Sequence, residues 1–430
     1  MSGGTIGMRG IRRTARRLAA LAAVLVGLFM TSPLAHASDA VMEWNQIALA
    51  ATVTANQGPL PQIRTMAIVH VSVHDAVNAV TREYKTYLDA PHKSWGASAD
   101  AAAIAAAHRA LVGLFSLQQQ ALNTARTASL AARGLSESDP GIAVGEAAAA
   151  AILALRSSDG SAQAQFPYTA PGAGAPGVWV AVGGAPALLP GWGSVAPWVL
   201  RDSSQFRPAG PPRLRSRRYA RDYNEVKDIG SAMSLTRTAE QTDIARFWLG
   251  SPSVIWNGVA RGIIEARELD LSSTARAFAL LYLAPADASI VCWDAKYTFN
   301  FWRPMAAIRE GDADGNDDTL GDPTWAPLFP TPPHPEYLSG HTTNSGAMAT
   351  VLKLLFGDDQ DVPVVATSPT NPGFERQWGS FSEGIEEVID ARVYSGIHYR
   401  TSDEVGARVG RAIARFVVSQ ELRPRRHRQH

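Results

Sequence analysis

Helical periodicity pervades this sequence and constrains its fold more than any other feature. The stretch RTMAIVHVSVHDAVNAV, residues 64–80, repeats its apolar side chains at close to the helical period. Two alanine-rich segments follow at about 99–131 and 142–156, and the helical period returns near Tyr219. We find no strand-like alternation of apolar and polar residues. The sequence therefore predicts an all-α protein.

Capping signals and one irregular segment divide this helical pattern. Thr238 with Gln241 resembles a capping box, and we expect Ser272 to cap a helix that reaches Pro285. Residues 161–212 hold nine of the 27 prolines and several tryptophans. So long an irregular segment with large aromatic residues is expected to pack over a surface.

The N-terminus has the order of a secretory signal peptide. Five arginines precede an apolar stretch from Leu18 to Met30, and Ala35-His36-Ala37 supplies a small-residue cleavage site. The apolar stretch is short for a membrane span, so we expect cleavage after Ala37, secretion and no stable membrane anchor. The expected regions are a signal peptide 1–37, an N-terminal helical region 38–160, an irregular segment 161–215, a catalytic helical bundle 216–422 and a solvated basic tail 423–430.

Charge and cysteine content exclude some classes of protein. Without residues 1–37, which carry five arginines and no acid, 35 basic residues face 39 acidic ones, a net charge near −4. The sequence contains no basic stripe with interleaved aromatic residues, so nothing in it indicates nucleic-acid binding. Cys292 is the single cysteine, so no internal disulfide forms. The sequence makes no prediction of the oligomeric state.

The triplet Ser339-Gly340-His341 stands where a proline-rich segment becomes a helical pattern. The first N–H groups of a helix lack internal partners and attract anions. Gly allows close approach to the backbone, Ser adds a hydroxyl group, and His adds a group that titrates near neutrality. An ordinary serine N-cap is the alternative interpretation.

Two further segments carry cations and histidine. Lys296 and Arg303 lie seven residues apart, about two helical turns, so we expect them on one helix face, with Pro304 ending or restarting the helix. Aromatic neighbours indicate burial, and buried cations require a partner. Arg392 and His398 flank a predicted helix end near Gly396.

Together the three segments resemble the signature of vanadium-dependent haloperoxidases, which share their site with type 2 phosphatidic acid phosphatases. The stretches HDAVNAV, PGWG, ARFW and PTPPHPEY also look like the secreted bacterial branch. The resemblance implies two helical bundles, with the site in the core of one. It also implies a vanadate cofactor, with hydrogen peroxide and a halide or a small organic molecule as substrates.

The resemblance assigns a role to each matching residue. Lys296, Arg303, Arg392, Ser339 and the Gly340 N–H would hold the oxyanion. His398 would bind vanadium axially, His341 would act as the acid–base group, and Lys296 would polarise the bound peroxide. Trp293, which matches a chloroperoxidase feature, and His334, which matches algal bromoperoxidases, would face the halide or substrate, so halide preference stays open.

The sequence departs from the family pattern at three places. Leu338 replaces the usual proline before Ser339, and Ala391 replaces the serine before Arg392. The aspartate expected four residues after His398 is absent, with Ser402 in its place and Asp403 one position later. We interpret Thr401 and Glu404 as a capping box that makes Asp403 a first-turn acid.

Two other polar groups have structural interpretations. His70 and His74 share a helix face beside Asp75, where hydrogen bonding is favoured over metal binding. The segment 312–322, DADGNDDTLGD, lacks the sixth-position Gly and closing Glu of an EF-hand, which favours an Asx-rich turn.

Three functions remain open at this point. The leading one is a secreted haloperoxidase. The second is an acid phosphatase that cleaves phosphomonoesters at the same site through a phospho-histidine at His398. The third is a non-catalytic, oxyanion-binding envelope protein.

Overall fold

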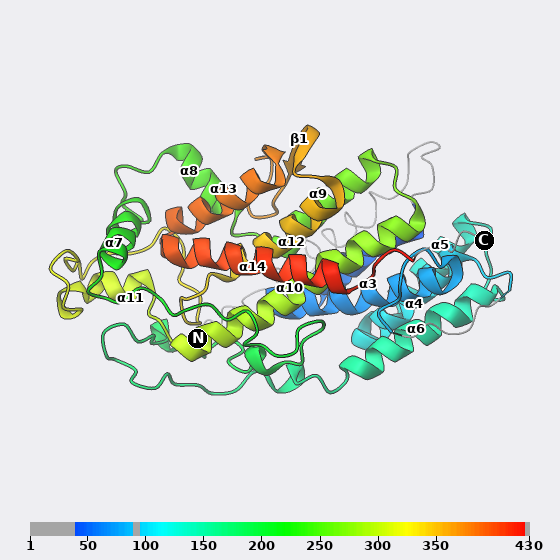
Figure 1. The fold of residues 1–430 in the computed structure, drawn as a ribbon, viewed down its shortest axis with the longest axis horizontal. Helices are drawn as coiled ribbons and strands as arrows, with labels where there is room; N and C mark the ends of the chain where they lie inside the picture. The colour runs from blue at the N-terminus through cyan, green and yellow to red at the C-terminus, as the bar shows by residue number, and fades with distance from the viewer. Residues whose placement is uncertain (1–38, 89–94, 426–430) are drawn as a thin grey trace, which may run out of the picture. The chain divides into compact units, whose positions relative to one another are not determined.

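The computed structural model describes residues 39–88 and 95–425, and these residues are mainly helical. The predicted signal peptide and the last five residues of the predicted tail lie outside this part. The all-α prediction is confirmed (Figure 1). The helices are α2 Ala40–Thr54, α3 Pro59–Thr81, α4 Ala99–Leu114, α5 Gln119–Ala132, α6 Pro140–Arg156, α7 Arg217–Ile229, α8 Ala239–Phe247, α9 Pro252–Ala266, α10 Leu271–Phe299, α11 Pro304–Arg309, α12 Gly340–Phe356, α13 Phe381–Tyr394 and α14 Arg400–Gln420.

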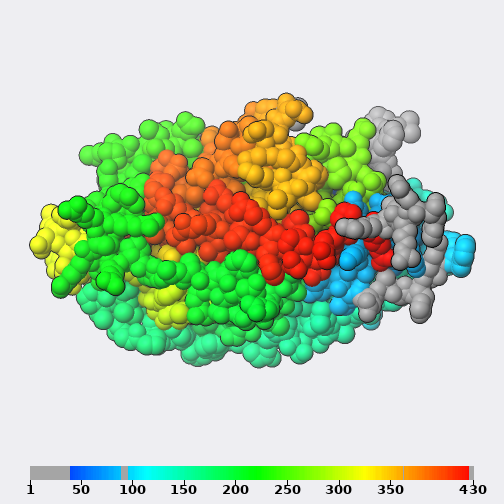
Figure 2. Space-filling view, viewed as in Figure 1, coloured from blue at the N-terminus to red at the C-terminus, as the bar shows by residue number. Residues whose placement is uncertain are grey.

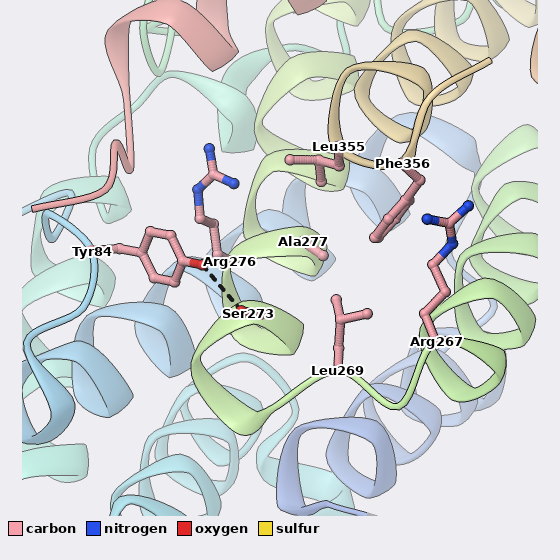
Figure 3. A pocket seen from close by; sticks show the side chains of 8 residues that line it. All are labelled: Tyr84, Arg267, Leu269, Ser273, Arg276, Ala277, Leu355 and Phe356. Atoms are coloured by element: carbon pink, nitrogen blue, oxygen red, sulfur yellow. Dashed lines mark hydrogen bonds between the residues drawn. The ribbon is translucent and has the colours of Figure 1, made fainter.

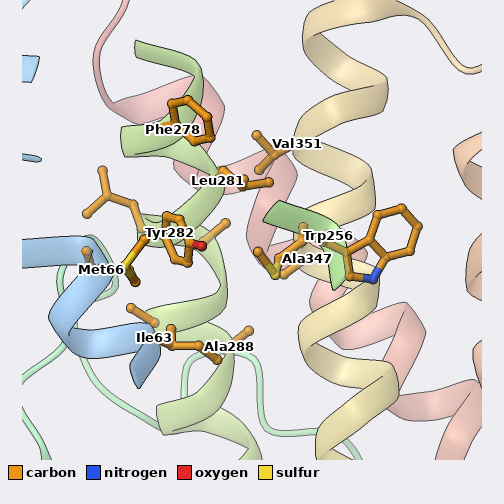
Figure 4. Packing of buried hydrophobic residues seen from close by; sticks show 14 of the residues in the cluster. Ile63, Met66, Trp256, Phe278, Leu281, Tyr282, Ala288, Ala347 and Val351 are labelled. Carbon is orange, nitrogen blue, oxygen red and sulfur yellow. The ribbon is translucent and has the colours of Figure 1, made fainter. Parts of the chain in front are cut away.

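Helix α10 joins two groups of helices. It packs against α3, which in turn contacts α4 and α6, and against α12 and α14. Figure 4 shows Ile63 of α3, Tyr282 of α10 and Val351 of α12 within one apolar core. Helix α10 is long and apolar enough to span a membrane, but 94% of its most apolar 18-residue stretch is buried inside the protein. That surrounding is typical of a core helix.

Small residues bring α12 and α14 into close contact. A Cβ atom on Gly410 would lie 2.0 Å from the backbone oxygen of Thr343, and one on Gly406 would lie 2.9 Å from that of Ser339. Glycine is therefore required where α14 crosses the start of α12. This crossing fixes the position of the Ser339-Gly340-His341 triplet.

The predicted irregular segment has no α-helix between α6 and α7, and its tryptophans are buried as expected. It lies along the surface beside α14 in Figure 2 and touches this helix through the Phe206–Phe416 ring pair. It also pairs with the chain after α10, where Trp302 N donates to Gly177 O at 3.1 Å and Trp179 N donates to Asn300 O at 2.7 Å. The segment therefore supports the residues that follow α10. The boundaries of the predicted regions stay predictions.

Four local predictions need correction. A two-stranded antiparallel sheet, β1 Asp359–Ala366 and β2 Arg376–Ser380, was not expected, because its strands are short and β1 is interrupted by a register shift. Asp270 rather than Ser272 caps α10, and this helix continues through Pro285 to Phe299. Residues 423–425 of the predicted tail are exposed or half-buried, but they are not frayed, because they pair with residues 83–85 through backbone hydrogen bonds. The capping box at Thr401 is discussed with the site.

Two structural predictions are confirmed. Thr238 and Gln241 form the expected capping box at the start of α8. The segment 312–322 is held by side-chain bonds of Asp312, Asp314 and Asn316 to nearby backbone N–H groups, as an Asx-rich turn requires.

Candidate active site

The predicted site residues come together from four parts of the chain. Trp293 and Lys296 lie on α10, Arg303 precedes α11, the triplet opens α12, and Arg392 and His398 flank the end of α13. A cavity of about 360 Å³ is lined by several of them. These lining residues are Trp293, His334, Gly340, His341, Arg392 and His398. Lys296, Arg303 and Ser339 are also fully buried.

Lys296 and Arg303 do not share a helix, which corrects the sequence prediction. Asn300 takes a left-handed conformation (φ 47°) and ends α10. The chain then restarts at Pro304, the first residue of α11, with Arg303 at its N-cap. The two cations meet through this turn and not through helical spacing. Proline restarts the helix because its ring fixes φ and the first turn needs no N–H donor.

Three buried cations form what we call the cation cage: Lys296, Arg303 and Arg392. Lys296 Nζ donates to the carbonyl oxygens of Pro335 and Glu336, both at 2.9 Å. Arg303 donates to the carbonyl oxygens of His334 at 2.9 Å and Ile397 at 2.8 Å. In residues 39–88 and 95–425, no carboxylate lies within ion-pair distance of the three groups.

Burial lowers the pKa of each cation of the cage. Burial lowers the pKa of Lys296 to about 7, and the nearby Arg303 acts in the same direction. Burial also lowers the pKa of Arg303 and that of Arg392 to about 10. An anion bound among them would relieve this cost, because opposite charge favours the protonated forms.

His398 is held in one tautomer by two neighbours. Its Nδ1 lies 2.8 Å from Glu336 Oε1, and its Nε2 lies 3.2 Å from Arg303 Nη1. A guanidinium group only donates, so Nε2 accepts and Nδ1 carries the proton that it donates to Glu336. His398 therefore presents a lone pair on Nε2, as a metal ligand or a nucleophile must.

The sequence analysis missed Glu336. It is fully buried, and burial raises its pKa to about 7, against the lowering effect of Arg303 and Lys296. Its carboxylate also accepts from Tyr399 N at 3.1 Å. The signal in the sequence is that Glu336 is the only acid between Asp322 and Asp358, directly before the triplet.

The triplet opens α12 without an ordinary cap. Ser339 occupies the N-cap position, but its side chain makes no capping bond. Several polar atoms near the cage lack a hydrogen-bond partner among the described residues, and they include Ser339 Oγ, His341 Nε2 and Arg392 Nε. Buried polar atoms are rarely left unpaired. Since His341 and Arg392 line the cavity, their unpaired atoms indicate space for a polar ligand.

The expectation that His341 titrates near neutrality is wrong for the cage without an anion. Burial, and then the positive charge of Arg392, lower its pKa well below the usual value. His341 is therefore neutral at pH 7. In this state it accepts a proton more readily than it donates one.

The predicted capping box at Thr401 is also wrong. Helix α14 begins at Arg400 after Tyr399, with no side-chain cap. Thr401 Oγ1 instead accepts from Arg218 at 2.7 Å. Asp403 lies in the first turn as expected, but it is fully buried, and burial raises its pKa well above the usual value. Nearby Ser339 lowers this pKa, yet the two side chains form no hydrogen bond of ordinary geometry.

His334 and Trp293 form one wall of the cavity. Their ring centres are 4.9 Å apart, and Lys296 Nζ lies 5.6 Å from the centre of the Trp293 ring. His334 Nδ1 is 2.9 Å from Arg303 Nη2. Both predicted halide-pocket residues contact cations of the cage. The structure therefore places His334 and Trp293 together beside the cation cage.

His70 and His74 lie outside this site. His70 contacts Asn45 at 2.9 Å and stacks on Tyr282, and His74 contacts Lys85 O at 3.0 Å, so both are held by hydrogen bonds as expected.

A second cavity, of about 540 Å³, is lined by Arg267, Arg276 and neighbours between α9, α10 and α12 (Figure 3). It is lined by none of the predicted site residues, so it is not the candidate active site.

Comparisons with known proteins agree with this geometry. Residues 276–426 match the family of the VCPO second helical-bundle domain. The chain is 34% identical over 174 residues to vanadium chloroperoxidase of Curvularia inaequalis, covering 33% of this chain and 28% of that protein. It is 33% identical over 106 residues to the vanadium-dependent bromoperoxidase of Ascophyllum nodosum, covering 21% and 18%. The matches thus span less than a third of these curated relatives.

A solved structure covers far more of the chain. The first bacterial vanadium-dependent iodoperoxidase is similar at a TM-score of 0.77 and 26% identity, over 92% of this chain and 99% of that one. An apo-type bacterial vanadium-dependent chloroperoxidase, at 18% identity and a TM-score of 0.68, shares the fold. The matched second-bundle domain, the curated relatives and the iodoperoxidase structure together support the vanadium haloperoxidase superfamily for this chain.

Proposed function

We propose that this protein is a vanadate-dependent haloperoxidase that oxidises a halide with hydrogen peroxide. The observation that carries the proposal is the cation cage. Three buried cations, with no carboxylate at ion-pair distance among the described residues, lie near His398, whose Nε2 lone pair faces Arg303. Several buried polar atoms around them lack a hydrogen-bond partner. The names of the similar proteins, all vanadium haloperoxidases, point to the same activity.

The residues present fit a vanadate ion. Lys296, Arg303 and Arg392 would neutralise its oxygens, and charge-assisted hydrogen bonds to oxyanions are stronger than neutral ones. Ser339 Oγ and the N–H of Gly340 would add further bonds at the start of α12. His398 would bind the metal through Nε2, since Glu336 holds the proton on Nδ1.

Bound vanadate would supply a Lewis acid that activates hydrogen peroxide for attack by halide. The chain would supply the proton handling. Neutral His341 would accept a proton from peroxide as it binds, and Lys296 would polarise the peroxide with its ammonium group. Trp293 and His334 would form the wall that the halide approaches. The half-buried cavity would limit the water around these groups.

The proposal also includes export of the protein through a cleavable signal peptide. The arginine-rich start and the apolar stretch of residues 1–37 support a cleavable signal peptide. We propose a secreted, mature protein that begins at Ser38 and has neither a membrane anchor nor a nucleic-acid partner. Mass spectrometry of the exported protein tests this. An intact N-terminus in a membrane fraction would contradict it.

A paired assay tests the activity. Purified mature protein is given hydrogen peroxide with iodide, bromide or chloride, with and without vanadate, beside a phosphomonoester assay. We expect vanadate-dependent oxidation of at least iodide, and His398→Ala should abolish both this oxidation and vanadate binding. Phosphomonoester hydrolysis without halide oxidation would instead assign the site to an acid phosphatase. Loss of neither activity in His398→Ala would remove His398 from the site.

A further inference from the structure

The cavity of about 540 Å³ in Figure 3 is lined by two arginines and by apolar side chains, and we call it the two-arginine pocket. The arginines are Arg267, at the end of α9, and Arg276, in the second turn of α10. The apolar lining consists of Leu269, Ala277, Leu355 and Phe356. Among the described residues, no acid lines the pocket. The lining therefore combines positive charge with apolar surface.

Arg276 is half-buried and has donors left for a ligand. Its Nε donates to Leu422 O at 2.7 Å, and its Cζ lies 5.0 Å from the centre of the Tyr84 ring. Within residues 39–88 and 95–425, its two terminal nitrogens form no hydrogen bond and no ion pair. Burial lowers the pKa of Arg276, although Tyr84 acts in the opposite direction. A bound anion would relieve the cost of burying this charge.

Arg267 lies at the exposed side of the two-arginine pocket. Its Nη2 donates to Gln360 Oε1 at 3.0 Å, and its Cζ lies 5.6 Å from the centre of the Phe356 ring. Because Gln360 is neutral, Arg267 also has no carboxylate partner in the described part of the chain. In Figure 3 the two arginine side chains flank the pocket, with Ala277 between them in this view.

Two hydroxyl groups complete the lining. Tyr84 Oη and Ser273 Oγ lie 3.0 Å apart and form a hydrogen bond. Asp270, which contacts Ser273, accepts from its N at 2.7 Å and from its Oγ at 3.2 Å as the cap of α10. This carboxylate forms an ion pair with neither arginine of the pocket, so it does not neutralise them.

The two-arginine pocket and the cation cage lie at opposite ends of the same two helices. Helix α10 runs from Ser273 at the pocket to Lys296 in the cage, and α12 runs from His341 beside the cage to Phe356 at the pocket. At a rise of 1.5 Å per residue, the positions from His341 to Phe356 span about 22 Å. A small ligand in the pocket therefore does not touch the cage.

We propose that the two-arginine pocket binds an aromatic carboxylate, at a site separate from the cation cage. Guanidinium groups bind carboxylates through charge-assisted hydrogen bonds, and the apolar lining would cover an aromatic ring. The volume of about 540 Å³ lies within the range for small-molecule sites, about 300–1,000 Å³. An inorganic anion would use the arginines but would leave the apolar side chains uncovered. The inference does not depend on the proposed haloperoxidase function.

Calorimetry with three probes tests the class of ligand. The mature protein is saturated with vanadate, so that the cation cage is occupied, and is titrated with 2-naphthoate. The alcohol 2-naphthylmethanol has the same rings without the charge, and acetate has the charge without the rings. We expect 2-naphthoate to bind at least about tenfold more tightly than either. Equal binding of the alcohol, or release of vanadate by 2-naphthoate, would overturn the inference.

A matched pair of charge reversals tests the location. Arg267→Glu changes the exposed arginine of the pocket, and Arg109→Glu changes an exposed arginine on α4 that lines neither cavity. Arg267→Glu should weaken 2-naphthoate binding at least about tenfold, because it places a like charge beside the ligand, and Arg109→Glu should leave the affinity unchanged. Equal affinities in the two variants would contradict the proposed site. This pair locates the probe whether or not the protein binds vanadate.

Arg276→Gln removes the half-buried charge and should weaken 2-naphthoate binding about 10–100-fold, the effect of losing a hydrogen bond to a charged group. Because Arg276 also holds Leu422, thermal unfolding of this variant is measured first. If the variant is unfolded at the temperature of the titration, the comparison of Arg267→Glu with Arg109→Glu decides. A folded Arg276→Gln that binds 2-naphthoate as tightly as the wild type would overturn the inference.

Discussion

Two groups of buried or half-buried cations in this protein differ in whether the chain supplies a counter-charge. In the first, the Asp159 cluster, Arg64 and Arg156 share the Asp159 carboxylate at 2.7 and 2.9 Å. Arg156 also lies 4.3 Å from the ring centre of Trp198. Hydrogen bonds and charges from the arginines and Ser161 lower the pKa of Asp159, although burial acts against this. The chain supplies its own anion here.

The cation cage holds three cations, and their hydrogen bonds to the chain go mainly to backbone carbonyl oxygens. Its two nearby acids, Glu336 and Asp403, have raised pKa values and so stay protonated more readily than usual. A buried charge needs a partner, and no carboxylate of residues 39–88 and 95–425 lies within ion-pair distance of the cage cations. The comparison teaches that the Asp159 cluster carries its own counter-charge, whereas the cage has the arrangement that the proposed binding of an external anion requires.

The largest expected effect is on the turnover of the enzyme with an anion bound in the cage. His341→Ala should lower kcat about 10²–10⁴-fold, because His341 handles the proton. Vanadate affinity should fall only by about 1.5–3 kcal/mol, one hydrogen bond to a charged group. Lys296→Ala should instead lower vanadate affinity more than kcat, since it removes a cation that compensates the charge of the anion. Steady-state kinetics and vanadate titration measure both, and full turnover in His341→Ala would end its catalytic assignment.

The next prediction compares the stability of the two groups directly. Asp159→Asn should destabilise the fold by about 3–5 kcal/mol, because it removes the carboxylate that neutralises the buried Arg156 and the half-buried Arg64. Lys296→Met should change stability by less than about 1 kcal/mol in anion-free buffer, since relief of repulsion from Arg303 offsets two lost hydrogen bonds. Urea unfolding at pH 7 measures both. Equal destabilisation would mean that the cage is also a structural cluster.

A smaller effect concerns the orientation of His398. Glu336→Ala should weaken vanadate binding about 10–100-fold, as is typical for a residue that positions a metal-binding histidine. Glu336→Gln should recover part of the affinity, because its carbonyl group still accepts from Nδ1. Asp403→Asn is the control and should have a smaller effect in the same vanadate titration. Equal losses in Asp403→Asn and Glu336→Ala would assign the positioning role to both acids.

The smallest effect is the pH dependence of anion binding. Lys296, with its pKa lowered to about 7, loses its proton between pH 6 and 8. Glu336, with its pKa raised to about 7, gains negative charge over the same range. Both changes make the cage less positive, so affinity should fall as pH rises, by about tenfold from Lys296 alone.

Calorimetry with sulfate, whose charge is constant in this range, measures the change. Lys296→Gln should flatten the profile. A profile that rises with pH would show that the cage is not the anion site.

The sequence by itself determined the helical fold, and it named candidate site residues that the structure brings together. Helices follow from the spacing of apolar residues, which is a local property, so α3 was predicted from residues 64–80 and the α8 cap from Thr238 and Gln241. The three motifs that contain Lys296, Ser339 and His398 predicted an oxyanion site, because together they resemble the signature of a known oxyanion-binding family. The strands and the start of α10 were missed, since their local signals are weak.

Only the tertiary structure decided how the site residues meet. Glu336 and His398 are 62 positions apart, and no spacing rule links them. Arg303 reaches the cage because Asn300 ends α10 and the irregular segment pairs with the chain beyond it. That no carboxylate of the described residues comes within ion-pair distance of the cage cations is likewise a property of packing. A sequence lists the charged groups, but the pairing of each one depends on distances that only the folded chain sets.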